Sequence, residues 1–79
     1  MATIFKEGDQ AVIKQDLSSA SILLYKGHQH SSPVMVCPCA LTGRVVTVKK
    51  VLPNNVYLCS FKDVAITMVY SEDLEVISN

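Results

Sequence analysis

Both histidines and two of the three cysteines of the chain lie in one short stretch, GHQHSSPVMVCPC. In an extended segment, residues two apart point the same way, so His28 and His30 could face one ion together. The same holds for Cys37 and Cys39, and two imidazoles with two thiolates would suit tetrahedral zinc. Structural zinc sites usually leave more residues between their cysteines, and Pro38 stiffens this spacer. We therefore predict no metal and no cofactor, with these four residues as a less favoured zinc site.

The same residues could supply a cysteine nucleophile and a histidine base. However, no acidic residue lies near them in the sequence, and a small domain has little volume for a catalytic pocket. The common alternative is that Cys37 and Cys39 are small apolar residues at the end of a strand, beside solvated histidines. We predict that the protein is not an enzyme.

The chain has 79 residues, 49% of them hydrophobic and 18% charged, with seven basic and seven acidic side chains. This length predicts a single domain, residues 1–79. An odd cysteine count is not typical of a secreted disulfide scaffold, and MATIFKEGDQ lacks the pattern of a signal peptide. The apolar run at 22–25 is far too short to cross a bilayer. A cytoplasmic protein that does not contact membranes is expected.

The rest of the sequence is rich in β-branched residues and shows almost no helical periodicity. Strand patterns are found at 10–15, 44–52, 56–61, 64–70 and 75–77. Turn residues separate them, namely Gly8 and Asp9, Pro53 to Asn55, and Lys62 with Asp63. Residues 71–74 are typical of one helical turn with Ser71 as its N-cap. Short strands joined by polar turns predict a small antiparallel barrel.

Apolar residues of the strands and of the helical turn form the predicted core: Val12, Val45, Val48, Val56, Leu58, Ile66 and Leu74. Leu74 is expected to close one end of the barrel. The acidic residues around it, Glu72, Asp73 and Glu75, are interpreted as a solvated surface that also favours the start of the helical turn. The functional alternative is an acidic contact for a basic partner.

Three motifs occur in succession: Gly-Asp-x-x-Val at 8–12, Gly-x-Val-x-x-Val at 43–48, and Tyr-x-x-x-Leu-Glu-x-Ile at 70–77. This succession resembles the SH3-like small β-barrels, which include KOW-type domains and PsaE-like accessory subunits. The resemblance covers roughly residues 5–15 and 43–77. It implies an all-β barrel of four to five antiparallel strands, with a long inserted first loop and a short helical turn near the C-terminus. Such barrels serve many functions, so the fold does not choose one.

Residues 16–42 break the strand spacing, and a loop of this length in a small domain is usually functional or has structure of its own. Within it, 22–25 and 34–37 are apolar enough to form short strands or packed flaps. The segment also concentrates the large apolar and amphipathic side chains that protein interfaces favour. We predict that it binds another protein, or a second copy of the chain, through Leu23, Leu24, Tyr25, His28, His30 and Met35.

The favoured function is therefore a non-enzymatic small binding module, either an accessory subunit of a larger complex or a phage- or plasmid-encoded modulator of a host protein. The first alternative, implied by the resemblance, is a KOW-like nucleic-acid-binding domain. Its basic edge would comprise Arg44, Lys49 and Lys50 beside Tyr57. The balanced charge disfavours this function, because phosphate binding usually needs a basic excess. A small zinc-stabilised domain built on the two histidines and the paired cysteines is the second alternative.

Overall fold

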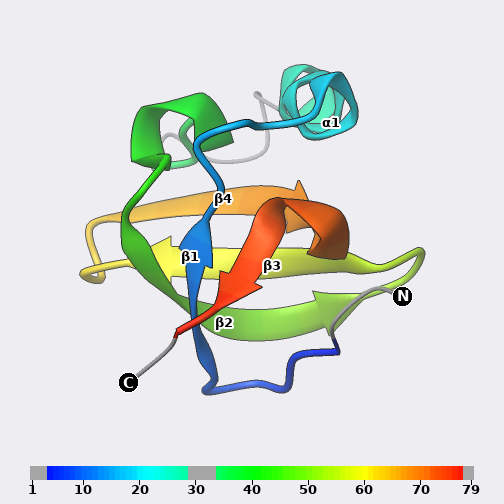
Figure 1. Ribbon diagram of the computed structural model, residues 1–79. Coiled ribbons are helices and arrows are strands. Elements are labelled where there is room, and N and C mark those ends of the chain that lie inside the picture. The colour runs from blue at the N-terminus through cyan, green and yellow to red at the C-terminus, as the bar shows by residue number, and fades with distance from the viewer. Residues whose placement is uncertain (1–3, 29–33, 78–79) are drawn as a thin grey trace.

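The computed structural model describes residues 4–28 and 34–77. Five antiparallel strands form one sheet in the order β4-β3-β2-β1-β5 (Figure 1). The elements are β1 (Gln10–Ile13), α1 (Ser19–His28), the 3₁₀ turn η1 (Pro38–Leu41), β2 (Val45–Leu52), β3 (Val56–Phe61), β4 (Ala65–Tyr70), the 3₁₀ turn η2 (Ser71–Asp73) and β5 (Leu74–Val76). The predicted antiparallel strands and the helical turn before the last strand are confirmed. No helix in the described ranges is long and apolar enough to span a membrane.

The two hairpins of the sheet are formed by residues in the left-handed region. Asn54 and Asn55 have φ of 65° and 62°, and Lys62 and Asp63 have φ of 51° and 59°. Asparagine tolerates this conformation well, so the turn after β2 follows from its sequence. Lysine tolerates it less well, and the hairpin between β3 and β4 is held by the pairing of the two strands, which runs without a register shift from Val56 to Phe61.

The core lies on the face of the sheet that carries Ala11, Ile13, Val46 and Val48, all of them buried. The sequence motifs had pointed instead to Val12 and Val45, and this part of the core prediction is wrong. Val45 is 46% exposed, and Val12, its partner across the strands, is only half-buried. The reason is the alternation of side chains along a strand, because residues 45 and 48 are three apart and face opposite sides.

The other predicted core residues divide into two groups. Val48, Val56 and Leu74 are buried, as predicted. Leu58 and Ile66 are only half-buried. Strand β3 nevertheless buries residues on both of its faces. Tyr57 and Cys59 pack in the core, while Val56 and Ser60 are buried on the opposite face. A second layer therefore covers part of the sheet.

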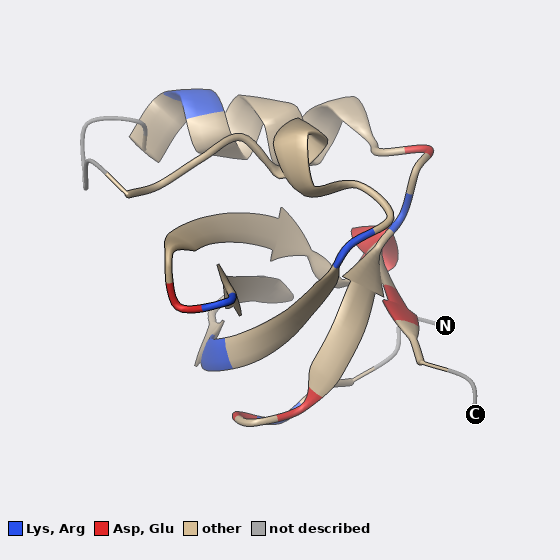
Figure 2. Cartoon of the chain, turned by 90° about the vertical axis from the view of Figure 1, so that its left-hand side faces the viewer, with Lys and Arg blue, Asp and Glu red and all other residues tan. Residues whose placement is uncertain are grey.

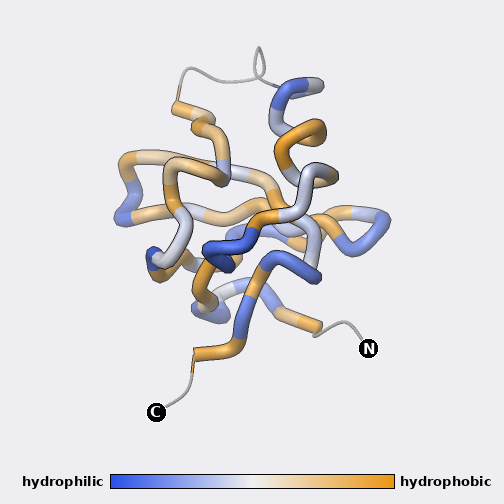
Figure 3. Tube along the Cα trace, turned by 45° about the horizontal axis from the view of Figure 1, so that its top comes forward, coloured by the Kyte–Doolittle hydropathy of each residue, from blue (hydrophilic) through white to orange (hydrophobic). Residues whose placement is uncertain are grey.

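That second layer contains α1, which the sequence analysis did not predict. Residues 22–25 are part of a helix and do not form a strand or a flap. Figures 1 and 2 show α1 and η1 above the β4 side of the sheet. Figure 3 shows that the middle of the helix is apolar and that its C-terminal end is hydrophilic. The first turn holds three small residues and no acidic residue, so local sequence gives this helix little support.

The support comes instead from Asp73, in η2. Its carboxylate accepts hydrogen bonds from the Ser18 backbone N–H (3.0 Å), from Ser18 Oγ (2.7 Å) and from Ser21 Oγ. Ser21 Oγ in turn accepts a hydrogen bond from the Tyr70 N–H (3.1 Å). Asp73 is 2% exposed, so its interpretation as a solvated acid is wrong. The carboxylate satisfies the Ser18 N–H at this helix end, and its negative charge interacts favourably with the helix dipole.

The chain returns from α1 along the edge of β4. Met35 forms a parallel bridge with Ile66, and the Val36 N–H donates to the Ile66 carbonyl oxygen (2.8 Å). Pro38 and Leu41 of η1 are buried. Gly43 then turns into β2 with φ 77°, and its N–H donates to the Ile13 carbonyl oxygen (2.7 Å). We call residues 17–28 and 34–41 together the cover of the sheet.

Candidate functional site

A hollow of about 280 Å³ lies where the C-terminal half of α1 meets the end of the β2–β3 hairpin. Three segments that are distant in sequence contribute to it, namely the helix, the hairpin and β4. The lining residues are Leu24, His28, Leu52, Pro53, Asn54, Val56, Met68 and Tyr70. Most of these side chains are apolar, so the hollow is suited to an apolar group.

The fold explains how these side chains come together. Leu24 and His28 are four residues apart, which places them on one face of the helix. Val56 is paired with Tyr70, and Met68 lies two residues before Tyr70, so all three lie on the same face of the sheet. Val56 and Met68 are each 6% exposed. They form the floor of the hollow, and the helix forms one of its walls.

His28 is the polar group at the rim. Its Nδ1 lies 3.0 Å from the Leu24 carbonyl oxygen, which can only accept a hydrogen bond. Nδ1 therefore carries a proton, and in the neutral ring Nε2 is the acceptor. The residue is exposed, so a bound molecule can reach Nε2. The hydrogen bond also fixes the ring near the last turn of the helix, where a positive charge is favoured.

A second hollow, of about 310 Å³, adjoins the first and shares Asn54 and Tyr70 with it. Its other lining residues are Asn55, Ser71 and Glu72. The Ser71 N–H donates to the Asn55 carbonyl oxygen (2.8 Å), which ties the hairpin turn to η2. An apolar hollow and a polar hollow with one carboxylate thus lie next to each other on this surface.

The structure places the predicted partner-binding residues in different settings. Leu24 and His28 line the apolar hollow. Leu23 is 65% exposed on the helix, and Tyr25 is half-buried. Met35 is engaged in the bridge to β4. His30 lies outside the described residues.

The basic edge of the nucleic-acid alternative is only partly present. Arg44, Lys49 and Lys50 are exposed, and Lys49 Nζ lies 3.6 Å from Asp63 Oδ1. Tyr57 does not belong to this surface, because it is 4% exposed in the core. Its ring makes an edge-to-face contact with Phe5, and its phenol oxygen accepts a hydrogen bond from the Phe5 N–H (3.2 Å). A ring held in this way offers no face on which a base could stack.

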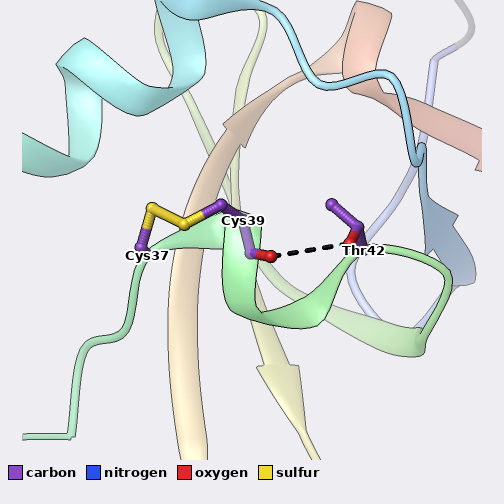
Figure 4. Close-up of a disulfide and its surroundings, with 3 residues drawn as sticks. All are labelled: Cys37, Cys39 and Thr42. Atoms are coloured by element: carbon purple, nitrogen blue, oxygen red, sulfur yellow. Dashed lines mark hydrogen bonds between the residues drawn. A yellow bond between two sulfur atoms is a disulfide. The ribbon is translucent and has the colours of Figure 1, made fainter.

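The cysteines of the opening stretch are bonded to each other. Cys37 and Cys39 form a disulfide with a Cα–Cα distance of 5.2 Å (Figure 4). Their interpretation as unpaired apolar thiols is therefore wrong, and a zinc ion would require their reduced form. In the described part of the chain, no three His, Cys, Asp or Glu side chains are grouped as metal ligands. The third cysteine, Cys59, is fully buried, and burial raises the pKa of its thiol to about 12.

Comparisons with protein-family models, curated proteins and solved structures found no match. The sequence analysis missed Leu52, Pro53, Val56, Met68 and Tyr70, because they face the hollow only once α1 covers the sheet. The i, i+4 spacing of Leu24 and His28 was the available signal, and it has meaning only for a helix.

Proposed function

We propose that the protein is a non-enzymatic binding module, and that it holds an extended segment of another protein at the two adjoining hollows. The observation that carries this proposal is the apolar hollow formed jointly by α1 and the sheet, with Leu24 in its wall. Its volume, about 280 Å³, lies at or below the lower end of pockets that enclose a small-molecule ligand, roughly 300–1,000 Å³. A space of this size accommodates one or two apolar side chains of a peptide.

The scaffold is proposed to be an SH3-like barrel. Support comes from the strand order β4-β3-β2-β1-β5, in which the last strand pairs with the first, and from the 3₁₀ turn directly before β5. The long first loop of such barrels commonly makes contacts, and in this chain that loop contains α1. The module would act as an accessory subunit or as a modulator of a host protein.

The chemistry of the partner follows from the lining. Leucine, isoleucine, phenylalanine or methionine would fill the apolar hollow over Val56 and Met68. The second hollow presents the Glu72 carboxylate and the amides of Asn54 and Asn55, which favour a lysine or arginine. The expected ligand is thus an extended peptide with one large apolar residue next to a basic residue. Among the described residues that line the apolar hollow, none is a carboxylate, serine or cysteine that could pair with His28, which supports binding over catalysis.

A display library of random linear peptides tests this function. Selection on the immobilised protein should enrich peptides in which a large apolar residue is close to lysine or arginine. Leu24→Ser should weaken the best synthetic peptide by about 2 kcal/mol, the size of a binding hot spot. Leu23→Ser is the matched control, because Leu23 is the preceding helical residue and does not line the hollow. Circular dichroism of both variants should remain native.

Other outcomes would assign the function elsewhere. If Leu23→Ser abolishes binding while Leu24→Ser does not, the outer face of the helix is the site. If both variants bind as the wild type does, the proposed surface is wrong. If Lys49→Ala with Lys50→Ala removes binding to a single-stranded oligonucleotide, and that binding falls steeply with salt, the nucleic-acid function replaces this one.

A further inference from the structure

The Cys37–Cys39 disulfide is placed where it contributes little to holding the fold. It joins two residues separated only by Pro38, and the shortest loops give the smallest entropic stabilisation. Other contacts already fix this part of the backbone. The Val36 N–H bonds to β4, the Ala40 N–H donates to the Cys37 carbonyl oxygen (2.9 Å), and Pro38 is buried. The two sulfurs should therefore remain neighbours whether or not they are bonded.

The two cysteine residues differ in how exposed they are. Cys39 is exposed at the start of η1, whereas Cys37 is half-buried. Once reduced, Cys37 would have a pKa above its ordinary value, because desolvation by burial and the side chain of Cys39 raise it, against opposing effects of a backbone hydrogen bond with Cys39 and of Lys26. A thiolate that approaches from solvent thus reaches the sulfur of Cys39 first, and the reduced pair starts to reoxidise through Cys39.

We propose that Cys37-Pro38-Cys39 is a reversible thiol–disulfide exchange site, whose co-reactant is a dithiol, either a small molecule or a protein with a paired-cysteine motif. A thiolate of the dithiol attacks Cys39 Sγ, the Cys37–Cys39 bond breaks, and Cys37 Sγ takes the electron pair and a proton. The second thiol of the dithiol then attacks its partner sulfur in the mixed disulfide and releases Cys39, which is protonated. Two electrons and two protons pass to the cysteine pair, and the dithiol becomes a disulfide.

Exchange is one of two roles that a bonded cysteine pair can have. Structural disulfides are typical of oxidising compartments, whereas disulfides in reducing compartments are usually transient and take part in exchange. Cys59 provides an internal standard, because it is fully buried and should not react in the folded protein.

The experiment is a redox titration of the whole protein in mixtures of reduced and oxidised dithiothreitol, quenched with acid and then alkylated without denaturant. Peptide mass spectrometry should show two alkyl groups on the reduced protein, at Cys37 and Cys39, and none at Cys59. The melting temperature should fall by about 10 °C or less on reduction, and the far-ultraviolet circular dichroism at room temperature should not change. Reduction that needs denaturant, or that unfolds the protein, would identify a structural disulfide. A pair that stays reduced in excess oxidised dithiothreitol would also overturn the proposal.

Single-cysteine variants test which sulfur reacts first. Glutathione disulfide should form a mixed disulfide at Cys39 in Cys37→Ser about fivefold faster or more than at Cys37 in Cys39→Ser, because Cys39 is the more accessible sulfur. Equal or reversed rates would overturn the assignment of Cys39 as the sulfur attacked first. The Cys37→Ser/Cys39→Ser double variant should show no adduct, and an adduct in that variant would place the reactive thiol at Cys59.

Discussion

The sheet and its cover are held together by different kinds of contact. In the sheet, β2, β3 and β4 are joined to one another by turns of three residues. In the cover, the first turn of α1 is held by Asp73, and Ser21 is 52 residues away from that side chain in sequence. The β2–β3–β4 part of the sheet is therefore specified largely by neighbouring residues, while the first turn of α1 depends on a remote carboxylate. Asp73 and Leu74 are adjacent in sequence, yet Asp73 accepts hydrogen bonds from the start of α1 and Leu74 packs in the core.

The largest effect is expected from Leu74→Ala, which removes a core side chain that is 3% exposed. Loss of its packing should lower the free energy of unfolding by about 2–5 kcal/mol. Urea melts give this number, and hydrogen exchange should show lower protection in all five strands alike. A loss below about 0.5 kcal/mol would mean that Leu74 does not close the end of the core.

Asp73→Ala should lower the free energy of unfolding by about 2–3 kcal/mol, because it leaves the Ser18 N–H and the Ser21 hydroxyl without their acceptor. The pattern of hydrogen exchange along the chain should also differ from that of Leu74→Ala. Amide exchange should accelerate more in α1 than in β2 and β3, since the cover would open locally. Glu72→Ala, at the exposed neighbouring position, is the control and should change stability by less than about 0.5 kcal/mol. Uniform exchange across both regions would show that the cover and the sheet unfold as one unit.

Replacement of each of two glycines by alanine should give the smallest changes in the free energy of unfolding, and the two changes should have opposite signs. Gly43 has φ 77°, and an added Cβ would lie 2.9 Å from Gln15 Nε2, so Gly43→Ala should cost about 1–2 kcal/mol. Gly27 is helical, and an added Cβ there would meet nothing within 4 Å. Gly27→Ala should therefore stabilise the protein by about 0.5–1 kcal/mol. Thermal melts of both variants check the signs, and destabilisation by Gly27→Ala would mean that this end of α1 is not regular helix.

Local signals in the sequence were sufficient for most of the sheet. Turn residues mark the bounds of β3, which was predicted at 56–61 and is found there. The prediction of which strand face packs in the core was less accurate. Val12 and Val45 were chosen from sequence motifs, although the alternation of side chains along the strand places Val46 and Val48 together on the core face. A shift of one residue moves a side chain to the other face, so small errors in register change the predicted core.

The candidate site could be predicted only in part, for a physical reason. The helix that forms its wall lacks strong local signals, and its stabilising charge comes from a residue that looks like solvated surface in the sequence. Without the helix, Leu24 and His28 have no common face. The disulfide was missed for a related reason, because whether two cysteines bond depends on a turn that the sequence describes only as a proline between them.

The distance along the chain between α1 and Asp73 also has a consequence for synthesis. Ser21 is made 52 residues before Asp73, which corresponds to about 3–10 s at common translation rates. During that interval the helix lacks its cap, and β4, on which it packs, is completed only at Tyr70, close to its end. Ile22, Leu23 and Leu24 are therefore exposed to solvent on the nascent chain, and we expect this to be the period in which it is most prone to aggregation or chaperone capture.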